Sequence, residues 1–430
     1  MPGLLASRVP TRWKFFCSLA LLTFVLGTTA THSRAATRIE THVPTAVYCC
    51  HGYANDTVSP AAAAPYVTWA NTDHTGADAD HAGGIKYVVE YIDVARVYRG
   101  DRAYPLIAGG KFSGAIARNC SGQPVATTPE GFMTDPYRRQ TLDLLDDEIS
   151  YNYNPAFAAY FVDDIDALRW GMRNGPPCRG NVPWTEPSAS LAYASLLASV
   201  RVDAGGREIT PKIIMNGLNQ YTDKPALHTV PLNTLRPSNV IGGMCEGCFA
   251  DNTPDNLKSG VEWQDDADLE IKTVRMRKIY WDYVRYIADD PRARLFTYAS
   301  FMLAWDPRFT IYQTAYKPNT PGQLHVTPET QLVAHDPLKR GFDSIAALRD
   351  RGGTYVREYR ACYFHARPIG PCAFVVNSDP TAHPAPRLSL EYGHSVTVSG
   401  GMVLEGGTVS FDGPRMPAVI APMTGLILVR

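Results

Sequence analysis

The chain has 430 residues, of which 45% are hydrophobic and 19% are charged, and its formal net charge is −1. This composition excludes a disordered chain, and the length suits one large domain or a large domain with a small one. No basic cluster stands out, so nucleic acid is not an expected partner.

Residues 1–36 predict a secretory signal peptide. They contain no acidic residue, and Arg8, Arg12 and Lys14 precede an apolar run from Phe15 to Leu26 that small residues follow. That order is typical of export signals. The run is too short to cross a hydrocarbon core of about 30 Å as a helix, and no later stretch is long and apolar enough to span a membrane. We expect a secreted protein, extracellular or periplasmic, without a membrane span after signal removal; an uncleaved anchor is the alternative.

Beyond residue 36, apolar strand-like runs alternate with amphipathic helical stretches. The predicted strands are Thr45–Cys50, Tyr66–Ala70, Ile85–Asp93, Ala158–Asp163, Lys212–Asn216, Val240–Met244, Arg294–Ala299 and Gln331–His335. The clearer predicted helices are Tyr137–Ile149, Ser188–Val202, Asp265–Ile287 and Phe342–Arg351. Nearly all-apolar strands are typical of a parallel sheet covered on both faces.

Eight strands with helices between them predict an α/β fold, a (β/α)8 TIM barrel over residues 37–352. A doubly wound open sheet would alternate in the same way, but no glycine-rich nucleotide turn follows the first strand. Residues 353–430 change in texture: short strand-like runs are separated by Gly-Gly, Asp-Gly and Pro-rich turns, and no helix is evident. They predict a small antiparallel β-sandwich domain.

The nine cysteines become eight when Cys17 leaves with the signal, and an even count in an exported chain favours disulfides. Cys362 and Cys372 flank a predicted hairpin and are expected to pair. Cys245 and Cys248 form a C-x-x-C without a second one at zinc-ligand spacing. We therefore expect structural bridging among the six cysteines Cys49, Cys50, Cys120, Cys178, Cys245 and Cys248. We expect neither a cofactor nor a metal. The pairing of the remaining cysteines stays open.

Catalytic groups of a barrel lie at the carboxyl ends of its strands. The run Tyr160-Phe-Val-Asp-Asp-Ile-Asp166 takes an apolar strand straight into an acidic cluster. Two adjacent carboxylates at the end of a core strand are costly unless they face solvent, a partner or a ligand. Asp163 is therefore predicted to be catalytic and Asp164 to contact substrate; a turn cap or a pair with Arg169 is the alternative.

A second acid, Glu246, emerges at a strand end after two glycines that allow close backbone approach, or it is an exposed loop residue. Five other candidates lie at or near strand ends, with a sixth near the predicted top loops: His51, Trp69, Glu90, Asp93, Asn216 and Trp305. These polar side chains could bind substrate hydroxyls, and the indoles could stack on sugar rings. Alternatively, Glu90 is a satisfied core acid, Asn216 starts a turn, and each indole belongs to the core.

Two carboxyl groups on opposite sides of a bond are what glycosidic cleavage requires. One protonates the leaving oxygen and the other attacks the anomeric carbon or activates water. Different environments can separate the pKa values of two such groups. The hypothesis from the residues is that Asp163 acts as nucleophile or base and Glu246 as acid.

The run Phe161-Val-Asp-Asp-Ile-Asp166 is similar to the strand-four signature of secreted barrel glycoside hydrolases with an α-galactosidase-like or α-amylase-like layout. Thr354-Tyr-Val-Arg-Glu-Tyr359 and Ala373-Phe-Val-Val-Asn-Ser378 resemble the β-sandwich that follows the barrel in those families. The resemblance implies a hydrolase of polysaccharides or oligosaccharides, with a glycan as its partner and Asp163 as nucleophile.

The chain departs from both patterns at the acid. The α-galactosidase-like pattern has an aspartate after strand six, where this chain has Glu246, and the α-amylase-like pattern has a glutamate after strand five, where it has Asn216. The acid/base assignment therefore stays open. Two other functions remain: a catalytically inactive carbohydrate-binding barrel, and a disulfide-linked surface protein without a ligand.

Overall fold

The computed structural model describes residues 40–48, 58–127, 131–165, 172–218, 229–250, 257–285, 287, 290–315 and 324–430. The chain from Glu40 onward is one compact unit. The expected signal peptide and His51 lie outside the described residues. Within the described part of the chain, no helix has the length and apolar character needed to cross a membrane.

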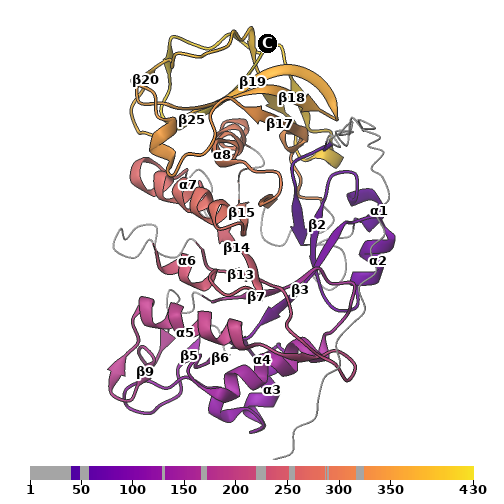
Figure 1. Ribbon diagram of the computed structural model, residues 1–430, viewed down its shortest axis with the longest axis vertical. Helices are drawn as coiled ribbons and strands as arrows, with labels where there is room; N and C mark the ends of the chain where they lie inside the picture. Colours follow the sequence, from indigo (N-terminus) through magenta and orange to yellow (C-terminus); the bar gives the residue numbers. More distant parts are fainter. Residues whose placement is uncertain are drawn as a thin grey trace, which may run out of the picture. The chain divides into compact units, whose positions relative to one another are not determined.

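An eight-stranded parallel barrel forms the centre of this unit (Figure 1). In sheet order its strands are β1 (Ala46–Tyr48), β2 (Trp69–Thr72), β3 (Tyr87–Asp93), β7 (Ala159–Asp163), β13 (Ile213–Asn216), β14 (Val240–Glu246), β15 (Ile279–Arg285) and β16 (Thr310–Ala315). A parallel bridge from Thr45 to Tyr312 brings the edge strands β1 and β16 together, so the barrel is nearly closed. The predicted fold class is confirmed.

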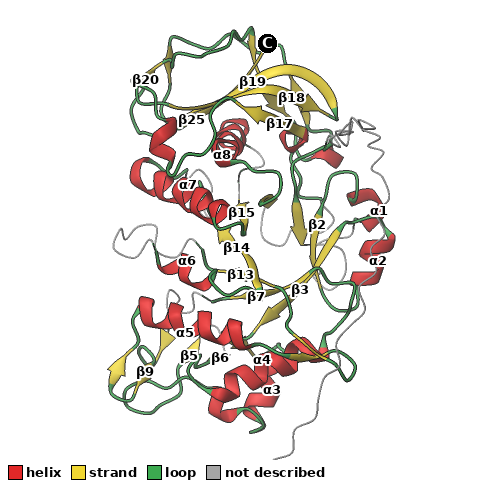
Figure 2. Cartoon of the chain, in the orientation of Figure 1, coloured by secondary structure: helices red, strands yellow, loops and turns green. Residues whose placement is uncertain are grey.

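Helices surround the barrel (Figure 2). They are α1 (Pro60–Ala63), α2 (Ala77–Ala82), α4 (Arg139–Tyr151), α5 (Glu186–Ser199), α6 (Val230–Thr234), α7 (Gly260–Arg275) and α8 (Pro291–Ala304), with α3 (Ala103–Ala108) in an insertion. Helix α5 begins at a capping box between Thr185 and Ser188. The predicted helices Tyr137–Ile149 and Ser188–Val202 are confirmed, whereas Phe342–Arg351 contains only a short 3₁₀ turn, Ile345–Leu348.

The prediction of a strand at Arg294–Ala299 is wrong, because this segment lies inside helix α8. Asp290 caps the helix by accepting a hydrogen bond from the Arg292 backbone N–H at 2.8 Å, and a proline follows it at the first helical position. An acidic cap followed by proline is a strong helix start. It outweighs the β-branched and aromatic character of the segment.

The predicted helix Asp265–Ile287 divides into α7 and strand β15. Arg277, between them, has a φ of +57°, a left-handed backbone that ends the helix. Strand β15 is buried on both faces, so its apolar residues continue the spacing of the helix and hide the period of two. Strands β15 and β16 therefore fill barrel positions that the sequence assigned elsewhere.

Strand β17 (Leu332–Pro337) forms where the last barrel strand was predicted, but it pairs antiparallel with β18 (Tyr355–Phe364). Gln331–His335 therefore belongs to the C-terminal sheet, which corrects its assignment to the barrel. The sheet has the order β17-β18-β19-β25-β21, with β19 (Arg367–Asn377), β25 (Thr424–Val429) and β21 (His394–Ser395). Smaller antiparallel pairs accompany it: β20 (His383–Pro384) with β24 (Val419–Ile420), and β22 (Thr397–Ser399) with β23 (Thr408–Ser410). The predicted domain limits stay predictions.

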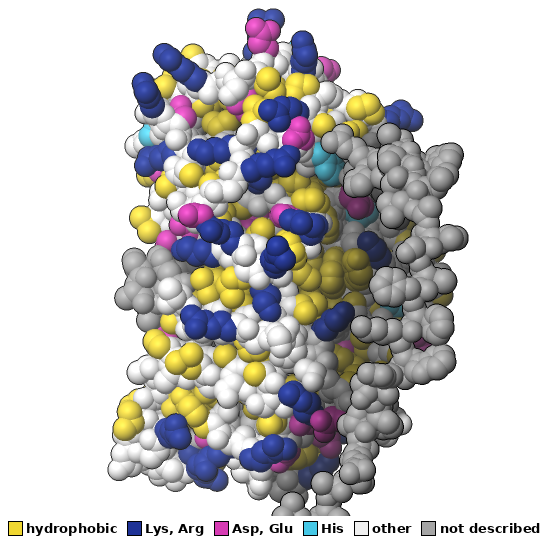
Figure 3. Space-filling view, viewed as in Figure 1, with side chains coloured by type: hydrophobic (Ala, Val, Ile, Leu, Met, Phe, Trp, Pro, Cys, Tyr) yellow, Lys and Arg dark blue, Asp and Glu magenta, His cyan; other side chains and the backbone are white. Residues whose placement is uncertain are grey.

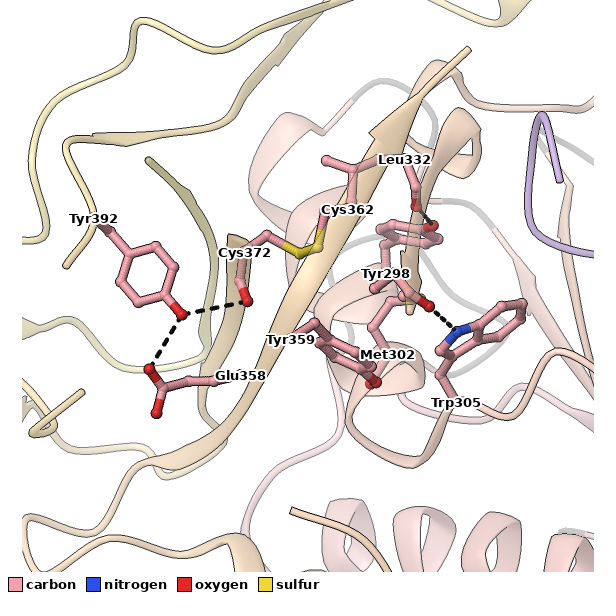
Figure 4. Close-up of a disulfide and its surroundings, with 10 residues drawn as sticks. Tyr298, Met302, Trp305, Leu332, Glu358, Tyr359, Cys362, Cys372 and Tyr392 are labelled. Atoms are coloured by element: carbon pink, nitrogen blue, oxygen red, sulfur yellow. Dashed lines mark hydrogen bonds between the residues drawn. A yellow bond between two sulfur atoms is a disulfide. The ribbon is translucent and has the colours of Figure 1, made fainter. Parts of the chain in front are cut away.

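Hydrogen bonds join helix α8 to the C-terminal sheet (Figure 4). The Tyr298 hydroxyl donates to the Leu332 carbonyl at 2.6 Å, and the Tyr359 hydroxyl donates to the Met302 carbonyl at 2.7 Å. Beside them lies the predicted Cys362–Cys372 disulfide, which is confirmed. Because these hydroxyls are buried, losing either partner would leave an unsatisfied polar group.

The loops after β3 and β7 combine into one small insertion. Its antiparallel sheet has the order β4 (Arg96–Tyr98), β6 (Gly131–Met133), β5 (Ala126–Thr127) and β8 (Met172–Arg173). A disulfide between Cys120 and Cys178 links the two loops. Two short hairpins complete the described strands: β9 (Cys178–Arg179) with β10 (Val182–Pro183), and β11 (Val202–Asp203) with β12 (Glu208–Ile209).

Side chains fill the barrel interior. They are Ala46, Trp69, Val89, Ala159, Phe161, Ile214, Met244, Trp281, Tyr283 and Ile311. A packed interior leaves the strand ends and their loops as the place for chemistry. On the face that Figure 3 shows, Lys and Arg side chains are scattered among apolar and acidic ones and do not form a single patch.

Candidate active site

Three predicted site residues meet at the carboxyl ends of neighbouring strands. Asp163 ends β7, Asn216 ends β13 and Glu246 ends β14. Each lies two positions after a side chain of the barrel interior, and alternate side chains of a strand share a face. All three therefore point to the inner side of the barrel mouth.

The Asn216 amide joins the two acids. Its Nδ2 donates to Asp163 Oδ1 at 2.7 Å and to Glu246 Oε2 at 2.7 Å. Because both oxygens lie 2.7 Å from one nitrogen, they are at most twice that distance, 5.4 Å, apart. The sequence predicted these residues separately; the fold brings them into one hydrogen-bonded group.

The Asp163 carboxylate accepts two further hydrogen bonds. The Tyr91 hydroxyl donates to Oδ2, and the backbone N–H of Asp164 donates to Oδ1 at 2.7 Å. Tyr91 comes from the neighbouring strand β3, where its ring stacks on Phe161. Donors from three directions fix the carboxylate and stabilise its negative charge.

Glu246 forms an ion pair with Arg285, which ends strand β15. Both side chains keep some exposure, 17% for Glu246 and 25% for Arg285, so they lie at the mouth of the barrel. The glycines before Glu246 serve close packing as expected. A Cβ on Gly242 would lie 2.5 Å from the Ile279 carbonyl oxygen of β15.

Asp93 and Asp164 complete the acidic group. Asp93 stands opposite Asp163 in the pairing of β3 with β7. Burial raises the pKa of Asp93 well above its usual value, and the nearby charges of Asp164, Asp163 and Asp101 raise it further. Asp164 pairs with Arg96 at 3.4 Å. Burial and these neighbouring charges all favour the protonated form of Asp93.

Three candidates are not brought to this group. Glu90 lies on the outer face of β3, between two side chains of the barrel interior. Trp69 is 8% exposed inside the barrel and packs against Trp281. Trp305, 3% exposed, follows α8, and its indole donates to the Ala334 carbonyl at 2.8 Å. Both indoles belong to the core, which was the alternative for each.

Two residues of the group were missed in the sequence. Tyr91 lies within a predicted strand, two positions before Asp93. In the sequence, a tyrosine at that position cannot be distinguished from a buried core residue. Arg285 lay inside a predicted helix, so its strand-end position was hidden. The sharp change from aromatic residues to Arg285 at the end of β15 is the signal that could have revealed it.

Among the described residues, one cluster has ligand spacing for a metal ion: Cys245, Cys248 and Asp266. Its two sulfurs form a disulfide with each other, one of the pairings that the sequence left open. The Lys258 ammonium lies 2.8 Å from Asp266 and already balances that carboxylate. This arrangement does not fit a cation.

Replacing Glu90 by glutamine should make the protein less sensitive to alkaline pH. Burial, then the charge of Asp73, raises the pKa of Glu90 from its usual value of 4.5 to about 9. Between these values the folded state holds a proton that the unfolded state has lost, so stability falls as the pH rises. Over this pH range the free energy of unfolding of the parent should fall by up to about 1.4 kcal/mol per pH unit. Glu90→Gln should not show this fall. Urea unfolding at pH 5, 7 and 9 measures the difference.

Asp336→Asn is the matched control for this prediction. Asp336 is exposed, and its hydrogen bond with Arg360 holds its pKa below the usual value. The stability that Asp336 contributes is therefore lost as the pH falls. Asp336→Asn should consequently not become less sensitive to alkaline pH than the parent. Parallel curves for the parent and Glu90→Gln would contradict the assignment of a buried, protonated Glu90.

No family model and no curated protein matches this chain. Among solved structures, the glycoside hydrolase domain of PelA from Pseudomonas aeruginosa is 12% identical, with 65% of this chain and 95% of that chain covered and a TM-score of 0.41. The isomalto-dextranase of Arthrobacter globiformis, complexed with panose, is 11% identical, with 90% and 72% covered and a TM-score of 0.43. An α-galactosidase from Geobacillus stearothermophilus, in complex with stachyose, is 9% identical, with 90% and 55% covered and a TM-score of 0.43.

These similar structures are glycoside hydrolases, the class that the sequence resembles. Their TM-scores all lie below 0.5, so they carry no argument about the reaction. The assignment of the barrel rests on the strand pairing described above.

Proposed function

We propose that this protein is an exported glycoside hydrolase that cleaves a polysaccharide or oligosaccharide by a two-carboxylate mechanism. One observation carries the proposal: Asp163 Oδ1 and Glu246 Oε2 both accept from the Asn216 amide nitrogen and are therefore at most 5.4 Å apart. Retaining glycosidases place their two carboxyls about 5–5.5 Å apart, whereas inverting ones leave about 6.5–9.5 Å for a water. An upper limit of 5.4 Å between these two oxygens favours the first geometry.

In this mechanism Asp163 attacks the anomeric carbon. Its carboxylate accepts hydrogen bonds from Tyr91, Asn216 and the Asp164 backbone, which fix its orientation. The bond to the leaving oxygen breaks as a bond to Asp163 forms, and a proton passes to that oxygen. Water then releases the sugar from Asp163.

Two carboxyls can supply the proton. Glu246 faces Asp163 through Asn216, and its carboxylate forms an ion pair with Arg285. Burial raises the pKa of Asp93 and favours its protonated form, and Asp93 stands beside Asp163 in the register. Asp93 lies on the strand next to that of Asp163, so we assign the role of general acid to Glu246. Asp93 is the alternative general acid that the test includes.

The test is reducing-end release from a broad glycan panel by the mature protein, Glu246→Gln and Asp93→Asn. Loss of release in Glu246→Gln with most activity kept in Asp93→Asn supports the assignment. The reverse pattern moves the acid to Asp93. A folded parent that binds glycans and releases nothing would favour the inactive carbohydrate-binding barrel.

The first product should keep the anomeric configuration of the substrate. Two displacements at the same carbon, the first by Asp163 and the second by water, restore the original stereochemistry. Proton NMR of the reaction in its first minutes, before the free sugar mutarotates, reads the anomer directly. An inverted first product would show that the carboxyls move apart to admit a water, contrary to the geometry described here.

Export is the remaining part of the proposal. The disulfides Cys120–Cys178, Cys245–Cys248 and Cys362–Cys372 suit an oxidising compartment. The N-terminal sequence of the protein recovered from culture medium or periplasm tests it, since cleavage is expected after Ala30 or Ala36.

A further inference from the structure

The segment that carries Glu246 is cross-linked on both sides. Cys245 precedes Glu246 and Cys248 follows two positions later; their sulfurs are bonded, and their Cα atoms lie 5.7 Å apart. Both cysteines are fully buried. Because Glu246 faces the inner side of the barrel, Cys245 faces outward, toward α7. The disulfide therefore lies directly behind the candidate acid.

Helix α7 holds the same segment through Asp266. Its Oδ2 accepts hydrogen bonds from the Phe249 backbone N–H at 3.0 Å and from Lys258 Nζ at 2.8 Å. The Lys258 backbone N–H in turn donates to the Phe249 carbonyl at 3.0 Å. Phe249 has a φ of +61°, a left-handed backbone that needs such support.

The neighbouring strand β15 supplies the third contact. Cys245 pairs with Asp282 in the register, and the Gly247 backbone N–H donates to the Tyr283 carbonyl at 2.8 Å. The chain reverses at Gly247, where φ is +83°. The turn after Glu246 is thus tied to β15 by its backbone and to α7 by Asp266, and the disulfide closes it.

The surroundings suit a neutral cross-link. Asp282 and Glu270 are fully buried behind β14, and neither carboxyl has a hydrogen-bond partner in the described structure. Burial raises the pKa of both carboxyls well above their usual values, so charge is costly at this position. A disulfide fixes the turn without adding charge.

We propose that the Cys245–Cys248 disulfide and Asp266 are positioning residues that hold the Glu246 carboxylate at the Asn216 amide. This inference rests on the proposed function and deepens it. Glu246 is the last residue of its strand, so without the cross-link its backbone could fray. A shift of about 1 Å in a catalytic group costs on the order of 100-fold in rate.

The test compares Cys245→Ser/Cys248→Ser with Cys362→Ser/Cys372→Ser, which removes a similarly buried disulfide far along the chain. We expect the first variant to lose about 10- to 100-fold in kcat with KM nearly unchanged. The control should lose stability and keep its kcat. Asp266→Asn keeps the disulfide and one acceptor oxygen, so its loss in kcat should be smaller. It is the second variant to measure if the double serine variant does not fold.

A structural readout accompanies the kinetics. In crystal structures, the distance from Glu246 Oε2 to Asn216 Nδ2 should stay near 2.7 Å in the parent and the control, and lengthen in Cys245→Ser/Cys248→Ser. If the contact is lost in Cys245→Ser/Cys248→Ser while the parent keeps it but cleaves no glycan, the positioning role is supported and the proposed function is rejected. An unchanged contact, a kcat equal to that of the control, or free thiols holding a metal in the parent would overturn the inference.

Discussion

Asp163→Asn should abolish hydrolysis, with a loss in kcat of about 10,000-fold or more, the scale seen when a hydrolase loses its nucleophile. The amide keeps the size of the carboxylate, but it cannot form the covalent bond to the sugar. The protein should still fold, because the donors to Asp163 sit at the barrel mouth and not in its packed interior. Initial rates on the best substrate of the glycan panel measure the loss.

Asp143→Asn provides the matched control. Asp143 lies on the exposed side of α4 and pairs with Arg139 one turn earlier. The same substitution there should leave kcat unchanged. If Asp163→Asn kept a tenth or more of the parent rate, Asp163 could not be the nucleophile, and the reaction would have to start from another group.

Glu329→Gln should destabilise the fold by about 3–5 kcal/mol, because it leaves a buried arginine without its counter-charge. Arg294 of helix α8 donates to Glu329 through Nε at 3.1 Å and Nη2 at 2.6 Å, and both side chains have 0% exposure. The third contact of Arg294, from Nη1 to the Gly400 carbonyl at 2.8 Å, joins the same arginine to the C-terminal region. Urea unfolding followed by circular dichroism gives the free energy.

The double variant Arg294→Leu/Glu329→Leu separates charge from packing. Removing both charges is expected to cost less than removing one, because no ion is left unpaired in the interior. Breaking the exposed pair by Asp143→Asn should cost at most about 0.5 kcal/mol. A loss of that small size in Glu329→Gln would mean that water reaches Arg294 and replaces the lost charge.

The acids of the site were visible in the sequence because the chain changes character abruptly at the ends of β7 and β14. Asp163 follows an all-apolar strand, and Glu246 follows a glycine-rich one. A core strand has no internal reason to end on carboxylates, so such residues point to solvent or to chemistry. Asn216 was named as well, although its role in joining the acids was not.

Two barrel strands were misplaced for a physical reason. Strand β15 is buried on both faces, so its residues Ile279–Arg285 show no alternation that would distinguish them from a buried helix. Segment Arg294–Ala299 has strand-like composition, but the cap at Asp290 makes it a helix. In Arg294–Ala299, helix capping outweighed the strand propensity of the residues. In β15, burial on both faces removed the alternation that marks a strand.

The sequence by itself determined the alternation of strands and helices, the strand-end acids and the pairing of Cys362 with Cys372. Each depends on residues close together in the chain, where periodicity and composition act. Only the tertiary structure decided that Tyr91, Asn216 and Arg285 share one site with Asp163 and Glu246, since they come from five strands. Barrel closure sets which strands are neighbours and which side chains face inward, and that order follows from packing across the whole chain.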